Sequence, residues 1–267
     1  MKKQPLAIFG VHDESGKIAL YPGVAALLEV LLMFLPAIPA YLWMWPNVQG
    51  TAQLIAQCLT YLYVLAGTLF IGLRRWSWGE LGLNRKGLGL SLMAGLVFLA
   101  GRLLVIQSVV WGGEPQRYSP AVLAWQVFYY ILMVGLVEEL LFRGLVYQAL
   151  DSWRGTRWAI WGSSFGFMLW HIFGQGPLIG AATFVLGLVF AVIRWRAGGI
   201  IGLIVLHGLW DLQAVLLVSE SNAQVLSWGR PEIPHPGWMV AGFAMMIAVP
   251  IYLWKLHPLV LTYWQIR

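Results

Sequence analysis

Residues 122–148 read VLAWQVFYYILMVGLVEELLFRGLVYQ, an apolar run in which the only charged side chains are Glu138, Glu139 and Arg143. A helix that crosses a bilayer needs ~20 mostly apolar residues at a rise of ~1.5 Å per residue, and this run is long enough. Similar runs recur along the chain, at residues 24–45, 54–73, 88–110, 158–173, 178–194, 199–218 and 237–255. The sequence therefore predicts an all-α polytopic membrane protein with about eight transmembrane helices.

The composition is that of a membrane protein. Hydrophobic residues make up 60% of the 267 residues and charged residues only 10%, which is too little charge for the surface of a soluble domain of this size. The formal net charge is +6, but Lys and Arg form no patch, so we expect no nucleic-acid partner. The single cysteine, Cys58, excludes an internal disulfide and a cysteine-rich metal site.

The basic residues indicate an orientation in the membrane. If the N-terminus faces the cytoplasm, fourteen of the 17 Lys and Arg residues fall in cytoplasmic segments, as expected for short cytoplasmic loops. The outside loops then contain only Arg117 and Arg230, and Arg102 lies within the third apolar run. Both termini are therefore predicted to be cytoplasmic.

This orientation divides the chain into three parts. Cytoplasmic tails are predicted at residues 1–22 and 259–267, on either side of a single transmembrane domain at residues 23–258. The short fifth and sixth runs, at residues 158–173 and 178–194, are also compatible with a re-entrant hairpin. Such a hairpin leaves the orientation of the other helices unchanged.

Five ionisable residues lie deep in three of the predicted helices: Glu138, Glu139, His171, His207 and Asp211. By helix rise, Glu138 is roughly 15 Å from the cytoplasmic end of its helix, His171 roughly 20 Å, and His207 and Asp211 roughly 12 to 18 Å. An ionisable residue at such depth costs roughly 2.5–3.5 kcal/mol on insertion scales, and it is tolerated where it faces a bundle interior or a wet cavity. The shared depth favours one site over separate packing residues and interfacial charges.

Spacing within each helix suggests which side chains act together. Glu139 and Arg143 are four residues apart, so they lie on one face and can pair, whereas Glu138 points about 100° away. His207 and Asp211 are also four residues apart. Phe167 precedes His171 by one turn and can pack over it.

These residues resemble the motifs of the CPBP family of intramembrane proteases, also called the CAAX protease, bacteriocin-processing or Abi family, to which the type II CAAX prenyl endopeptidases belong. The pattern EExxxR appears as EELLFR at residues 138–143, FxxxH as FMLWH at 167–171, and HxxxN or HxxxD as HGLWD at 207–211. The resemblance covers about residues 120–215. Asp211 stands where the prenyl endopeptidases have Asn, and aspartate occurs in prokaryotic relatives. The resemblance leads us to expect a multi-pass protein of a prokaryotic cytoplasmic membrane.

The resemblance implies an intramembrane endopeptidase that uses an activated water and forms no covalent acyl-enzyme. Glu138 is then the base and His171 orients the water, while His207, with Asp211, stabilises the oxyanion or protonates the leaving amine. Glu139 and Arg143 support the helix end. The expected partners are membrane lipid and a peptide or protein with a membrane-associated segment, whether a prenylated CaaX protein, a bacteriocin or pheromone leader, or another membrane-anchored peptide.

Metal dependence stays open at this point. Two histidines and two or three carboxylates match the ligand count of Zn²⁺, so His171, His207, Glu138 and Asp211 are candidate ligands. Relatives are labelled metalloproteases, and some are described as glutamate-dependent without metal. The sequence lacks the HExxH spacing that places two histidines on one helix. We therefore expect no certain cofactor and favour the metal-free mechanism, with Zn²⁺ as the alternative.

Two functions outside the protease class use the same residue types. A catalytically inert scaffold, such as an immunity or partner-binding protein, can bind its partner in the same cavity. A transporter can use intramembrane Glu, Asp and His residues as a proton relay. The sequence contains no pair of repeated halves, which many transporter folds show.

Overall fold

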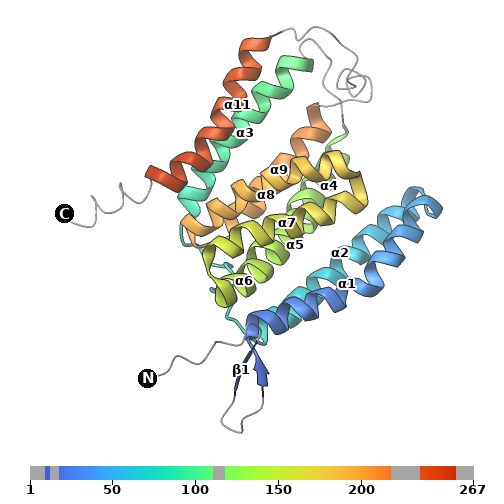
Figure 1. Ribbon diagram of the computed structural model, residues 1–267. Helices are drawn as coiled ribbons and strands as arrows, with labels where there is room; N and C mark the ends of the chain where they lie inside the picture. Colours follow the sequence, from blue (N-terminus) through green and yellow to red (C-terminus); the bar gives the residue numbers. More distant parts are fainter. Residues whose placement is uncertain (1–9, 13–17, 111–117, 218–234, 257–267) are drawn as a thin grey trace. The chain divides into compact units, whose positions relative to one another are not determined.

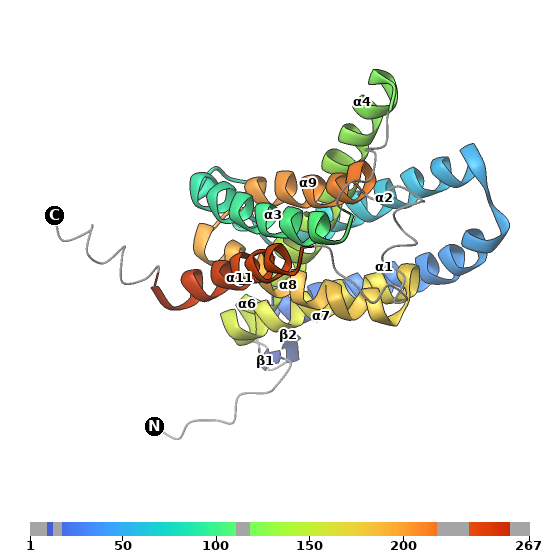
Figure 2. The same ribbon diagram turned by 90° about the horizontal axis from the view of Figure 1, so that it is seen from above.

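A computed structural model describes residues 10–12, 18–110, 118–217 and 235–256 (Figures 1 and 2). The chain divides into two units. The first unit is Met1–Leu83 with Leu140–Ala191, and the second unit is Asn84–Glu139 with Val192–Arg267. The predicted N-terminal tail lies partly outside the described residues. The predicted C-terminal tail and the basic residues assigned to outside loops, Arg117 and Arg230, lie wholly outside them.

The first unit begins with a short antiparallel hairpin that the sequence pattern does not predict. Strand β1 (Gly10–His12) pairs with β2 (Ile18–Leu20), with Val11 opposite Ala19. Strands of three residues are too short to show the apolar alternation by which a strand is recognised in a sequence. Apart from this hairpin, the described elements are all helical, as the sequence predicts.

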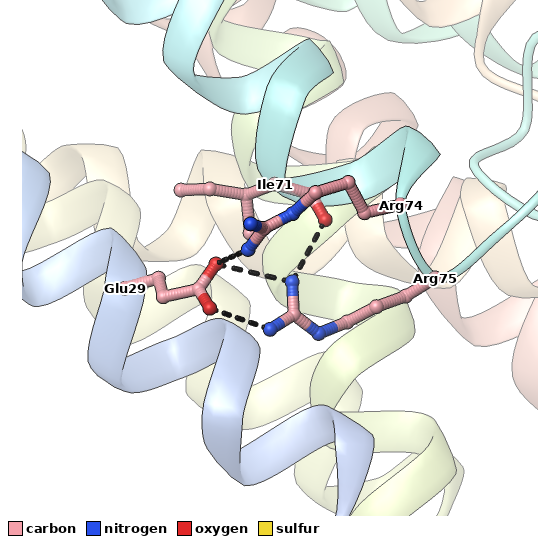
Figure 3. A network of polar contacts seen from close by, with 4 residues as sticks. All are labelled: Glu29, Ile71, Arg74 and Arg75. Atoms are coloured by element: carbon pink, nitrogen blue, oxygen red, sulfur yellow. Dashed lines mark hydrogen bonds and ion pairs between the residues drawn. The ribbon is translucent and has the colours of Figure 1, made fainter.

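Helices α1 (Pro22–Asn47) and α2 (Gly50–Leu73) of the first unit lie side by side and share an ion-pair network (Figure 3). Arg74 Nη2 donates to Glu29 Oε2 at 2.6 Å. Arg75 donates to both oxygens of Glu29, at 2.6 and 3.0 Å, and to the Ile71 carbonyl at 3.1 Å. The network ties the first part of α1 to the end of α2, so Glu29 has a structural role there.

The remaining helices of the first unit follow one another with little intervening chain. The π-helix η2 (Leu140–Val146) continues into α6 (Tyr147–Arg154), which packs against α1 and α7 (Thr156–Gln175). Only Gly176 separates α7 from α8 (Pro177–Ala197), which begins in the first unit. Gly176 has a φ of 86°, which glycine adopts without strain, and Pro177 suits the first turn of a helix. Both helices are longer than the predicted runs.

In the second unit, α11 (Pro236–Ile251) lies along α3 (Leu88–Val110), as both views show (Figures 1 and 2). The π-helix η3 (Tyr252–Leu256) follows Pro250 at the end of α11. Arg196 donates to the carbonyls of Leu253 and Trp254 at 2.7 and 3.1 Å. These bonds supply partners for carbonyls at the end of a helix, where helical partners are missing.

The stretch that carries the two deep glutamates is one helical run that alternates between α-helical and π-helical segments. It consists of α4 (Pro120–Phe128), η1 (Tyr129–Gly135) and α5 (Leu136–Glu139) in the second unit, and η2 follows in the first unit. Ser119 caps α4 by accepting a hydrogen bond from the Val122 N–H at 3.4 Å. Two π-helical segments thus flank the four residues that contain Glu138 and Glu139.

The helices have the length and composition of a multi-pass membrane protein. All eight predicted apolar runs are helical, and among the described residues six helices are long and apolar enough to cross a membrane. The shorter apolar helix α9 (Ile201–Leu217) and α7 are not among the six. The chain is therefore an integral membrane protein, and the count of eight spans and the cytoplasmic termini stay predictions.

Candidate active site

The second unit brings three deep side chains into one cluster around His207. His207 Nδ1–H donates to Glu139 Oε1 at 2.8 Å, and His207 Nε2 lies 3.7 Å from Glu138 Oε2. All three side chains are buried, with at most 3% of each exposed. Because a carboxylate can only accept, the bond to Glu139 places a proton on Nδ1 and directs Nε2 towards Glu138.

Close packing of α9 against η1 sets this arrangement. Gly208 follows His207, and a Cβ at this position would lie 2.7 Å from the Ile131 Cα of η1. Gly135, just before α5, faces α9 in the same way, since its Cβ would lie 2.6 Å from the Ile204 carbonyl oxygen. Such glycines let helix backbones approach each other closely in membranes. The approach brings the ring of His207 within hydrogen-bonding distance of α5.

Asp211 extends the cluster by one turn of α9. Its Oδ2 atom lies 3.7 Å from His207 Nε2, and its side chain is 26% exposed, so it is the least buried member. Asp211 also interacts electrostatically with Arg102 of α3 and with Tyr130 of η1. The predicted pair of His207 and Asp211 thus belongs to a larger polar group within the second unit.

The first unit holds a second group around Phe167 of α7. The Arg143 guanidinium lies 4.2 Å from the Phe167 ring centroid, and Arg143 Nη2 donates to the Gly187 carbonyl at 3.4 Å. His171 Nδ1–H donates to the Phe167 carbonyl at 2.9 Å, and the two ring centroids are 4.4 Å apart. Arg143 and Phe167 are fully buried. Donation from Nδ1 fixes the tautomer in which Nε2 of His171 carries the lone pair.

The predicted site residues therefore fall into two groups. Glu138, Glu139, His207 and Asp211 meet in the second unit, whereas His171, Arg143 and Phe167 lie in the first unit. The pairing of Glu139 with Arg143 stays a prediction. Helical spacing does not predict the bond between Glu139 and His207, because spacing relates only residues of one helix. The shared depth of the two residues in the sequence is the signal that points to it.

The described residues contain no group of three or more His, Cys, Asp or Glu side chains arranged to hold a metal ion. In the cluster around His207, Nδ1 is engaged by Glu139, and Nε2 lies 3.7 Å from each of the other two carboxylates. Metal dependence therefore stays a prediction, with Zn²⁺ as the alternative. The mechanism proposed for this cluster uses no metal ion.

Comparisons with known proteins find a family model that matches the part of the chain containing this site. Residues 120–213 match the family model described as type II CAAX prenyl endopeptidase Rce1-like. No curated protein and no solved structure matches the chain significantly. The matched residues include all three motifs, from Glu138 to Asp211, and both groups described above. Over residues 120–213, the chain is therefore similar to the Rce1-like type II CAAX prenyl endopeptidases.

Proposed function

We propose that this protein is an intramembrane endopeptidase, which hydrolyses a peptide bond of a lipidated or membrane-associated substrate with an activated water. The observation that supports it most is the buried cluster of Glu138, Glu139 and His207 within apolar helices. Charged groups at such depth are costly and mark functional sites by default. The family model that matches residues 120–213 is named for a type II CAAX prenyl endopeptidase.

The proposed chemistry uses the two ring nitrogens of His207 differently. Glu139 holds Nδ1 and so orients the ring. Nε2 and Glu138 Oε2, 3.7 Å apart, are too far for a direct hydrogen bond, but both can contact one water or one substrate oxygen. Glu138 takes a proton from the water as its oxygen attacks the peptide carbonyl. When His207 is protonated, its Nε2–H stabilises the oxyanion, and the proton on Glu138 passes to the leaving amine.

His171 is proposed to orient the attacking water, as the family resemblance implies. Its bond to the Phe167 carbonyl supports this role, because it leaves Nε2 as the ring acceptor. Arg143 and Phe167 hold that ring in place: the guanidinium lies over the Phe167 ring, and the tilted Phe167 ring packs against His171. These three residues lie in the first unit, and the roles of Glu138 and His207 do not depend on them.

The substrate class is proposed from the same observations. A site within membrane-spanning helices suits a peptide that is held at the membrane by a lipid or an apolar segment. A multi-pass protein with a site inside its helices also suits a location in a cytoplasmic membrane, with lipid as its permanent partner.

The test compares two Glu→Gln variants of the purified protein in proteoliposomes, with lipidated and unlipidated peptides as substrates. Product masses identify the cleaved bond. Glu138→Gln should lower kcat by about 10²- to 10⁴-fold, the usual contribution of a general base, and still bind substrate. Glu80→Gln is the matched control, because Glu80 is a loop residue whose carboxylate accepts from the Ser77 N–H and O–H. Equal cleavage by both variants contradicts the proposal. If neither variant nor the wild type cleaves the peptides, the result favours a catalytically inert scaffold.

A further inference from the structure

Arg102 is the only charged residue of α3, and it lies well inside this membrane-spanning helix. A guanidinium at such a position is expected to have a specific set of partners and a function. The motifs of the sequence do not include Arg102, and the chemistry proposed above does not use it. Its contacts are all within the second unit.

One turn of α9 supplies those contacts. Arg102 Nη1 donates to the Trp210 carbonyl and lies 3.5 Å from Gln213 Oε1, while the guanidinium stacks 3.8 Å from the Trp210 ring centroid. Phe98, one turn before Arg102 on α3, also stacks on Trp210, with centroids 5.2 Å apart. Gln213 Nε2 in turn donates to the Leu99 carbonyl at 3.2 Å. Together these contacts attach α3 to the turn Trp210–Gln213.

This turn contains Asp211. Arg102 and Asp211 interact electrostatically, and Asp211 Oδ2 lies 3.7 Å from His207 Nε2. The charged groups that share this environment are Glu138 and Glu139 of α5, with the Tyr130 hydroxyl of η1 beside Asp211. Arg102 therefore supplies a positive charge to Asp211, whose carboxylate lies beside His207.

We infer that Arg102 is a positioning residue of the active site, which fixes the α9 turn that carries Asp211 and balances the charge of Asp211 beside His207. It acts through Asp211 and touches neither the substrate nor the reacting water. The inference rests on the proposed function for its effect on cleavage. The coupling between Arg102 and Asp211 can be measured without any substrate.

The kinetic test uses two substitutions of Arg102 and one control. Arg102→Met should lower kcat about tenfold with little change in KM, as expected for the loss of an interaction between neighbouring groups. Arg102→Lys keeps the charge and should recover most of kcat. Arg75→Met is the control, because it removes an arginine that pairs with Glu29 in the first unit, so it should lower Tm but change kcat less than about twofold. A rise in KM alone for Arg102→Met, or Arg102→Lys as impaired as Arg102→Met, overturns the inference.

A double-mutant cycle with Asp211→Asn gives the second test, in both kcat and Tm. If Arg102 acts through Asp211, Arg102→Met should have much less effect in the Asp211→Asn background than in the wild type. Full additivity in both quantities overturns the inference, and the proposed function then stands if the wild type cleaves its substrate. If the two substitutions are coupled in Tm but the wild type cleaves no substrate, the proposed function is contradicted, while the link between Arg102 and Asp211 is supported.

Discussion

At the scale of single residues, the two adjacent glutamates of α5 differ in what their carboxylates reach. Glu139 accepts a hydrogen bond from His207 Nδ1, whereas Glu138 lies 3.7 Å from Nε2 on the other side of the ring. Glu139 is thus placed to hold the imidazole, and Glu138 to share a water or substrate oxygen with it. Glu138 is thus placed as a base and Glu139 as an orienting carboxylate, on either side of one histidine.

This difference predicts unequal effects of substitution. Glu139→Gln should lower kcat about 100-fold, because an amide can orient the ring in the wrong tautomer, but some activity should remain. Glu138→Gln should lower kcat further, towards the upper end of the roughly 10²- to 10⁴-fold contribution of a general base. Steady-state kinetics on variants of matched Tm measure both. An active Glu138→Gln together with a fully inactive Glu139→Gln reverses the two assignments.

Asp211 predicts a pH effect. Its carboxylate lies 3.7 Å from His207 Nε2, where a negative charge favours the protonated imidazole that the mechanism uses. Asp211→Asn withdraws this charge, so kcat should fall and the alkaline limb of the pH–activity curve should shift to lower pH. The measurement is kcat from pH 5 to 10, a range that spans the ordinary histidine pKa of about 6.5. An unchanged curve argues against the role of Asp211, and recovery of the variant by added Zn²⁺ points to a metal ligand instead.

At the scale of elements, the approach of α9 to η1 predicts a packing effect on the site. Gly208→Ala places a Cβ 2.7 Å from the Ile131 Cα, so the helices must separate and the His207–Glu139 bond must lengthen. Overpacking of this kind typically costs about 1–3 kcal/mol. We expect lower Tm and lower kcat together. Gly237→Ala is the control, since a Cβ there meets no atom within 4 Å; a Gly208→Ala protein equal to this control contradicts the packing argument.

The elements also show what a sequence can and cannot predict. The eight helical runs follow from apolar length, because this is a local property of the chain. The shared depth of Glu138, Glu139, His171, His207 and Asp211 stays a prediction from helix rise. The π-helical segments η1 and η2 leave the apolar pattern of residues 122–148 unchanged, so the sequence does not show them. The Glu139–His207 bond and the role of Arg102 depend on which helices are neighbours, and single-helix spacing does not contain that information.

At the scale of the whole molecule, the distribution of Lys and Arg predicts the topology. Reporter fusions after Leu20 and after Lys255 should both report the cytoplasm, and a fusion after Tyr118 should report the opposite side, because basic residues concentrate in cytoplasmic loops. Protease protection of the same fusions is an independent check. An external C-terminal reporter removes the argument that Glu138, His171 and His207 share one depth, since that argument depends on the direction of each helix.

The central claim is that Glu138 and His207 activate a water within the membrane, without a covalent intermediate. Its most direct test is a single turnover of a membrane-anchored peptide in heavy-oxygen water that contains hydroxylamine, with product masses as the readout. We predict heavy oxygen in the new carboxyl terminus, no hydroxamate, and no product with Glu138→Gln. A hydroxamate product, or the same turnover by Glu138→Gln, contradicts the claim.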